Sequence, residues 1–357
     1  MSQRDEPEPL SRALAGWLRP KLPNAEDLVV AAVPRSVATG FSSDTLLFDL
    51  AWREAGSPRS RAIVVRRAPL GHQVFPEYDV ARQHRILRIL AGTQVPVPPA
   101  PWLEEEANVL GAPFYVMDRI EGRIPTDNPP YHVGGWTTQI SPAEREALWW
   151  SGLEALATIH GLDWRALGLG FVDTAGHADT PLGRQLDDYA HFLAWAARGK
   201  PQPTCESALG WLRENRPTGP EPVGFCWGDA RPGNMIFRDG RCVAVLDWEM
   251  ATLGNPVQDL AWWLFLDRHH SEGLGAPRLP GFPGRVETIE AWERKTGHSA
   301  RDLDYYEVFA AFRFAVIMIR VAQGFVAGGL IPADARLETD NIPTRLLAKL
   351  LGLPSPA

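Results

Sequence analysis

The side chains best suited to chemistry lie in one segment, residues 225–261. Asp229 comes first, Asn234 follows five positions later, and Asp247 ends a run of apolar residues. Between Asn234 and Asp247 the stretches NMIFR and CVAVLD flank Asp239-Gly240, a dipeptide typical of tight hairpin turns. Pairing of these two strands would bring Asp229, Asn234 and Asp247 to the same end of the hairpin.

These three side chains suit phosphoryl transfer. Asn and Asp supply oxygen ligands for a hard cation such as Mg²⁺, which takes its remaining ligands from phosphate and water. A second Asp nearby can accept the proton of a substrate hydroxyl. Acids beside a hairpin are common on protein surfaces, so the spaced set carries the prediction rather than any one Asp.

The elements before this segment predict a small lobe made mostly of antiparallel sheet. Apolar spacing indicates a helix over 11–22, and β-branched or apolar runs indicate strands over 45–52 and 61–67, joined by the turn-type segment EAGSPRS. A helix over 78–90 and strands over 102–105 and 113–120 follow. We assign residues 1–117 to this lobe.

The remaining residues, 118–357, predict a mainly helical lobe. Apart from the hairpin segment, apolar residues recur at helical spacing. The stretch 312–325 is the most apolar, but Arg313, Arg320 and Gln323 interrupt it, so we expect a buried helix and no membrane span. Helices are expected over 142–160, 182–195, 204–214, 257–266, 285–296, 303–323 and 344–351.

Composition narrows the function class. The 357 residues include 45% hydrophobic and 22% charged residues, which is typical of globular proteins. Three cysteines without Cys-x-x-Cys spacing argue against a zinc ribbon, a thioredoxin-like site and a disulfide scaffold, and they fit a cytoplasmic protein. The net charge of −7 argues against nucleic acid or an anionic membrane as a partner.

The segment GDARPGN, Gly228 to Asn234, resembles the motif of the aminoglycoside phosphotransferase family, relatives of protein kinases. It is most similar to the branch that resembles the kinase-like domain of some acyl-CoA dehydrogenases, and the likeness extends from about Gly40 to at least Trp263. The resemblance implies an α+β, two-lobed, protein-kinase-like fold. It also implies that Asp229 is catalytic, that Asn234 and Asp247 hold Mg²⁺, and that Asp259 has a structural role.

The resemblance also implies a nucleotide site with several departures from the family pattern. ATGFSSD would cover the phosphates through Gly40, Phe41 and Ser42. Arg66, with Arg67 as its rival, stands where a Lys is expected, and Gln83 stands where its partner Glu is expected. Backbone groups from Met117 to Arg119 would contact the base.

Four further residues bear on this interpretation of the motif. Trp227 replaces the His of the family's His-Gly-Asp, and we expect it to pack the loop. Arg231 could contact a phosphate or an anionic substrate, or form a salt bridge. Glu249 could lie near the metal or contact the substrate. His160 matches a recurrent family His, for which we expect a core role.

The sequence therefore predicts a phosphotransferase that moves the γ-phosphoryl group of Mg·ATP or Mg·GTP to the hydroxyl of a small molecule. The acceptor remains open between an aminoglycoside and a less cationic metabolite such as a hydroxyacyl thioester. The alternative, motivated by Arg66, Gln83 and Trp227, is a nucleotide-binding pseudokinase or regulatory module. The oligomeric state is not readable from the sequence.

Overall fold

The computed structural model describes residues 7–33, 42–173 and 178–356. The chain forms two compact units, and the first comprises residues 1–73, 77–93 and 97–121. The second contains 74–76, 94–96 and everything from residue 122 onward. The first unit thus extends past residue 117, because the backbone of Arg119 still bonds to Ala62 of the sheet.

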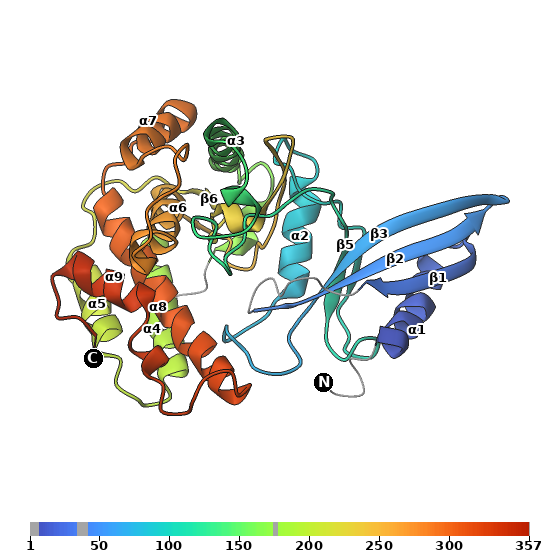
Figure 1. The fold of residues 1–357 in the computed structure, drawn as a ribbon, viewed down its shortest axis with the longest axis horizontal. Coiled ribbons are helices and arrows are strands. Elements are labelled where there is room, and N and C mark those ends of the chain that lie inside the picture. The colour runs from blue at the N-terminus through green and yellow to red at the C-terminus, as the bar shows by residue number, and fades with distance from the viewer. Residues whose placement is uncertain (1–6, 34–41, 174–177, 357) are drawn as a thin grey trace. The chain divides into compact units, whose positions relative to one another are not determined.

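The first unit is built on a five-stranded antiparallel sheet of order β1-β2-β3-β5-β4. Figure 1 shows α1 beside the strands at one end of this sheet and α2 beside β5. Its elements are α1 (Pro7–Leu18), β1 (Glu26–Val33), β2 (Asp44–Glu54), β3 (Ser57–Arg67), α2 (Val80–Leu90), β4 (Trp102–Glu104) and β5 (Phe114–Asp118).

Register separates the two faces of this sheet. Ile63, Val65, Phe114 and Val116 point to one face and form a core with α1. Their neighbours along each strand must point to the other face, because side chains alternate along a strand. That second face carries Tyr115, whose hydroxyl donates to Gln83 of α2 at 3.5 Å.

Three local expectations for the first unit need correction. Helix α1 ends at Leu18 rather than at residue 22, because Pro20 removes a backbone donor and a 3₁₀ turn follows. The β2–β3 connection is a two-residue turn at Ala55-Gly56, where both residues have positive φ and match the twist of the strands. Strand β1 was not expected at all.

The second unit is mainly helical. Its helices are α3 (Pro142–His160), α4 (Pro181–Ala197), α5 (Pro203–Glu214), α6 (Val257–His269), α7 (Arg285–Thr296), α8 (Leu303–Ala327) and α9 (Ile342–Leu351). Its strands form two small antiparallel pairs, β6 (Gly224–Cys226) with β9 (Thr252–Gly254) and β7 (Met235–Arg238) with β8 (Arg241–Val245).

Helix α8 is the central element of this unit and packs against α4, α5, α6 and α9 (Figure 1). Among the described residues it is the one helix long and apolar enough to cross a membrane, yet 78% of its apolar window is buried inside the protein. Helix α8 therefore has the burial of a core helix.

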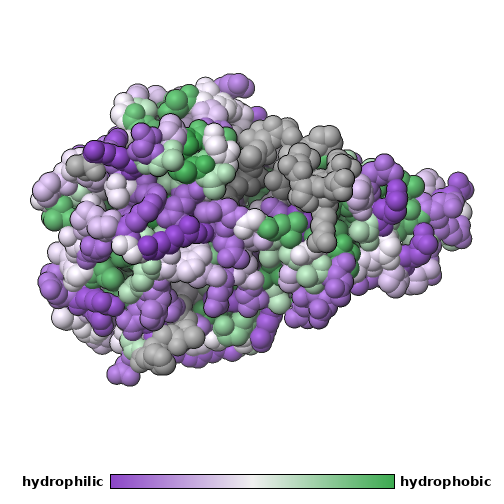
Figure 2. Space-filling view, turned by 90° about the horizontal axis from the view of Figure 1, so that it is seen from below, coloured by the Kyte–Doolittle hydropathy of each residue, from purple (hydrophilic) through white to green (hydrophobic). Residues whose placement is uncertain are grey.

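On the face drawn in Figure 2, apolar residues form small separate groups among polar ones.

Candidate active site

The β7–β8 hairpin joins two of the predicted site residues. Asp239 and Gly240 both have positive φ and form the two-residue turn that the sequence predicted. At the other end of the hairpin, the backbone N–H of Leu246 donates to the carbonyl of Asn234 at 2.9 Å. Asp247, the next residue, therefore lies beside Asn234, and its φ of 62° is a conformation that Asp tolerates better than most residues.

Asp229 is held by three side-chain donors. The amide nitrogen of Asn234 lies 2.6 Å from Oδ2, and Nε1 of Trp262 lies 2.8 Å from Oδ1. Nε of Arg231 also donates to Oδ1, at 3.1 Å. Because Asn234 turns its amide nitrogen toward Asp229, its amide oxygen faces the opposite way. Asn234 and Asp247 both carry side-chain oxygens, which is the kind of ligand that Mg²⁺ prefers.

Arg231 is enclosed by carboxylates. It forms an ion pair with Asp127 in addition to its bond with Asp229. Burial alone would lower the pKa of Arg231, but the charges of Asp127, Asp229 and Asp247 raise it above its usual value. Of the roles left open for Arg231, the salt bridge is the one the structure contains.

The two glycines of GDARPGN each make room for this arrangement. Gly228 has a φ of 91°, and a Cβ there would lie 2.0 Å from the carbonyl oxygen of Met250. A Cβ on Gly233 would lie 2.5 Å from Nη1 of Arg231 and 2.6 Å from Oδ1 of Asp127. Substitution at either position would displace the loop or the ion pair.

Asp259 holds the backbone in front of Asp229. Its carboxylate accepts the N–H of Trp227 at 2.6 Å and that of Gly228 at 2.9 Å. The indole of Trp227 donates in turn to the carbonyls of Leu246 and Asp247, so this residue links the loop to the end of the hairpin.

His160 is a core histidine with both ring nitrogens occupied. Trp292 donates to Nδ1 at 2.9 Å, so Nδ1 is an acceptor and the proton is on Nε2, which lies 3.2 Å from Asp259. His160 therefore supports Asp259 by donating its Nε2–H to the buried carboxylate. Glu249 lies half-buried in the turn after Asp247.

The expected nucleotide-binding residues lie in the first unit. Gly40 and Phe41 fall outside the described residues, and Ser42 is buried just ahead of β2. Arg66 is paired across the strands with Tyr115, so both side chains share the face that carries Gln83.

Arg67 points to the opposite face of the sheet. It is bonded there to Asp44 at 2.7 Å and to the carbonyl of Leu110 at 2.8 Å. The geometry therefore favours Arg66 over Arg67 as the residue that works with Gln83.

At the end of β5, the N–H groups of Asp118 and Arg119 already donate to Pro99 and Ala62. The side chain of Arg119 forms an ion pair with Asp49. A nucleotide base near residues 117–119 could therefore bond to backbone carbonyls, whereas the N–H groups of Asp118 and Arg119 are already used.

Sequence reasoning missed several residues of the site. Asp127, Trp262 and Arg313 contact it from positions far away in the chain. Helix α6 runs to His269, so that His270 is buried at its C-terminal end and His269 is half-buried.

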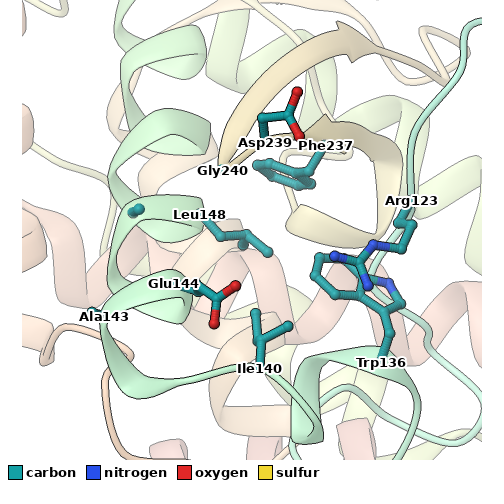
Figure 3. Close-up of a pocket in the computed structure, with 10 residues that line it drawn as sticks. Arg123, Trp136, Ile140, Ala143, Glu144, Leu148, Phe237, Asp239 and Gly240 are labelled. Carbon is teal, nitrogen blue, oxygen red and sulfur yellow. The ribbon is translucent and has the colours of Figure 1, made fainter.

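A pocket of about 460 Å³ lies at the turn end of the β7–β8 hairpin, away from Asn234 and Asp247. Figure 3 shows Leu148 and Glu144 of α3 on one side of it and Arg123 with Trp136 on the other. The guanidinium of Arg123 lies 4.3 Å from the centre of the Trp136 ring. None of the predicted site residues lines this pocket.

Comparison with known proteins places the site in context. The family model described as "Phosphotransferase enzyme family" matches residues 35–294. The "Probable acyl-CoA dehydrogenase IBR3" of Arabidopsis thaliana is 30% identical over 334 residues, which is 88% of this chain and 39% of the relative. "Acyl-CoA dehydrogenase family member 11" of Rattus norvegicus is 27% identical over 79% of this chain and 36% of its own. The chain thus spans about two fifths of the length of these curated relatives.

Solved structures show the same fold. A protein from Ralstonia eutropha assigned as an aminoglycoside phosphotransferase has a TM-score of 0.68 at 25% identity, covering 95% of both chains. The aminoglycoside phosphotransferase APH(4)-Ia, in a complex with ADP and hygromycin B, has a TM-score of 0.57 at 16% identity. That alignment covers 95% of this chain and 98% of the other, and it establishes the two-lobed kinase-like α+β architecture.

Proposed function

Because the chain belongs to the phosphotransferase enzyme family, we propose that it transfers the γ-phosphoryl group of Mg·ATP or Mg·GTP to a hydroxyl of a small molecule. The observation that carries this proposal is the arrangement of Asp229 beside Asn234 and Asp247. Three donors orient the Asp229 carboxylate, and one of them is Asn234, whose backbone is bonded to Leu246, the residue before Asp247.

Asp229 is the proposed catalytic residue. Its carboxylate orients the acceptor hydroxyl and takes its proton as the oxygen attacks the γ-phosphorus. The bond from the γ-phosphorus to the bridging oxygen breaks, the nucleoside diphosphate leaves, and Asp229 later releases the proton to solvent.

Asn234 and Asp247 are the proposed ligands of Mg²⁺. Among the described residues no group of three or more His, Cys, Asp or Glu is placed to hold a metal ion. A pair of oxygen ligands fits Mg²⁺, which usually keeps few protein ligands and shares the rest of its shell with phosphate and water. When bound, the ion would neutralise charge that develops on the phosphates.

Arg66 is the proposed phosphate contact in the first unit. A guanidinium can bind phosphate through two parallel N–H groups, so Arg is a workable replacement for Lys. Gln83 would orient Arg66 through a neutral hydrogen bond in place of an ion pair. Ser42, Gly40 and Phe41 are proposed to cover the phosphates.

The charged side chains near Asp229 limit the charge that the acceptor molecule can carry. The nearby acid Asp127 is already paired with Arg231, and the side chain that α8 brings to this loop is the cation Arg313. A polycationic aminoglycoside would need unpaired carboxylates. We therefore propose an acceptor without multiple positive charges, such as a hydroxyacyl thioester or another hydroxylated metabolite.

Thermal unfolding with Mg·ATP and Mg·GTP tests the nucleotide and metal sites. A nucleotide at about 100 times its Kd should add about 2.7 kcal/mol to the free energy of unfolding, and thus raise Tm by several degrees. The Asp247→Asn variant should lose the Mg²⁺-dependent part of the shift. Asp239→Asn, at the other end of the same hairpin, should keep it.

An ADP-release assay then tests transfer. The panel should contain aminoglycosides, hydroxy acids, hydroxyacyl thioesters and polyols, with Asp229→Asn as the inactive comparison. Turnover with one hydroxyl class that Asp229→Asn abolishes would support the proposal. A nucleotide-dependent Tm shift without turnover on any acceptor, and without ATP hydrolysis, would favour the pseudokinase reading instead.

A further inference from the structure

Arg313 of α8 clamps the backbone immediately before Asp229. Its side chain is buried, with 2% exposed, and Nη2 donates to the carbonyl of Gly228 at 3.0 Å. Nε donates to the hydroxyl of Tyr189 at 3.1 Å, which fixes the plane of the guanidinium. Because Asp259 accepts the N–H of Gly228, both polar backbone groups of this residue are held by buried charged side chains.

Arg313 also stacks on the indole that bonds Asp229. Its guanidinium carbon lies 4.7 Å from the centre of the Trp262 ring. The Nε1–H of that ring donates to Oδ1 of Asp229. A cation over an indole face draws electron density from the ring, which makes the indole N–H a stronger donor. Arg313 therefore reaches Asp229 by two routes, the backbone and the indole.

An ordinary salt bridge does not explain this arginine. Within the part of the chain that the structure describes, Arg313 has no carboxylate partner, and its Nη1 is buried without a hydrogen bond. The rings of Trp262, Tyr189 and Phe309 surround it at 4.7–5.4 Å. An unpaired buried cation is costly, so its placement against the loop needs a reason other than fold stability.

The same helix offers a matched comparison. Arg320 is also buried, with 3% exposed, and its guanidinium lies 4.2 Å from the centre of the Trp195 ring. It donates to Gln323 on its own helix. Arg313 and Arg320 thus share their helix, burial and aromatic stacking, and they differ in the contact that Arg313 makes with Gly228.

We propose that Arg313 is a positioning residue for Asp229, acting through the carbonyl of Gly228 and through the hydrogen bond that Trp262 donates. This inference rests on the proposed function, in which Asp229 orients and deprotonates the acceptor. Arg313 does not touch the substrate; it fixes where the carboxylate stands and how strongly one of its oxygens is hydrogen-bonded.

The structural half of the proposal can be tested without any turnover. In ¹⁵N-tryptophan-labelled protein, the Trp262→Phe variant identifies the indole N–H resonance of Trp262 by its disappearance. Arg313→Lys keeps the positive charge but loses the planar guanidinium, whose Nε and Nη2 donate to Tyr189 and to Gly228. It should move this resonance and speed its hydrogen exchange at least tenfold, whereas Arg320→Lys should leave both unchanged.

The kinetic half uses ADP release from Mg·ATP with the acceptor found in the panel, or without acceptor if only hydrolysis is seen. Arg313→Lys and Trp262→Phe should each lower kcat by about 10- to 100-fold while KM for the nucleotide stays within about twofold.

Two controls separate positioning from packing. Trp263→Phe removes a buried indole from the same helix whose N–H has no acceptor among the described residues. It should leave kcat close to wild type, as should Arg320→Lys. The double variant Arg313→Lys/Trp262→Phe should lose less than the product of the two single effects, because both act on the same carboxylate.

The outcomes are distinguishable from failure of the proposed function. An unchanged Trp262 resonance in Arg313→Lys would overturn the positioning role, even in an active enzyme. Equal losses of kcat in Arg313→Lys and Arg320→Lys would also overturn it, since they would report packing alone. If wild type shows no turnover, the proposed function fails and the resonance still decides the structural link. If Arg313→Lys does not fold, the kcat and KM of Trp262→Phe decide.

Discussion

Asp259 accepts a hydrogen bond from the backbone N–H of Gly228, at 2.9 Å, in the interior of the second unit. The same carboxylate accepts the N–H of Trp227 and contacts Nε2 of His160, so three donors converge on it. Its side chain has no exposed surface. This carboxylate therefore fixes the backbone on which Asp229 stands.

Asp259→Asn should lower the free energy of unfolding by about 2–4 kcal/mol. The amide would turn an NH₂ group toward one of the buried donors, and that donor would lose its acceptor. Urea denaturation measures the change. Asp304→Asn, at a side chain that is 99% exposed, should stay within about 0.5 kcal/mol of wild type. Similar losses in both variants would contradict the bracing role.

Gly228→Ala should destabilise the protein far more than Gly56→Ala. Both glycines have positive φ, 91° and 76°, so each substitution carries backbone strain. Only Gly228 faces a backbone carbonyl at 2.0 Å, and nothing lies within 4 Å of a Cβ on Gly56. We expect about 1 kcal/mol for Gly56→Ala and at least 3 kcal/mol for Gly228→Ala, measured by thermal unfolding.

Arg66 and Arg67 should respond in opposite ways to replacement by Met. Arg66→Met should remove most of the stabilisation by Mg·ATP, because the proposed phosphate contact is lost. Arg67→Met should keep that stabilisation but lower Tm without ligand, because Asp44 and the carbonyl of Leu110 lose their partner. Tm with and without Mg·ATP gives both quantities. Loss of the ligand effect in Arg67→Met alone would reverse the assignment.

Stability should fall as the pH drops below about 7, in part through His270. Burial, aided by the charge of Arg231, lowers the pKa of His270 in the folded chain to about 3. An unfolded His has a pKa near 6.5, so between these values only the unfolded chain gains the proton. The contribution of His270 to the free energy of unfolding is complete above about pH 6.5 and is lost as the pH falls toward 3.

Between pH 7.5 and 5.5 this residue alone should remove about 1.4 kcal/mol from the free energy of unfolding. Urea denaturation at the two pH values checks it. His270→Gln should flatten the dependence by about that amount. His191→Gln, at an exposed position of α4, should leave it unchanged. Identical slopes in wild type and His270→Gln would show that His270 does not contribute.

Sequence reasoning succeeded where the determinants are local. The hairpin at Asp239-Gly240 was predictable because the turn dipeptide and the two flanking runs are contiguous. Strand β1 was missed because its residues have no clear alternation, and its identity depends on pairing with β2. Strands β6 and β9 are three residues each, too short to show a period.

The partners of the site were hidden for a related reason. Asp127 contacts Arg231 across 104 residues, and Arg313 contacts Gly228 across 85. No spacing rule connects such positions, since the contacts exist only after the helices pack. Nothing in the local pattern distinguished Trp262 from Trp263, its neighbour on α6.

The hairpin that joins Asn234 to Asp247 and the helix contacts that orient Asp229 also differ in when they can form during folding. Asn234 and Asp247 are joined by a short hairpin, whose closure requires little chain entropy and which can form early in folding. The orientation of Asp229 depends on α6 and α8, whose contacts close much longer loops. A chain with a formed hairpin and an undocked α8 would hold the proposed metal ligands together while lacking an aligned base. Completion of the helical core is thus the step at which the protein would become able to transfer phosphate.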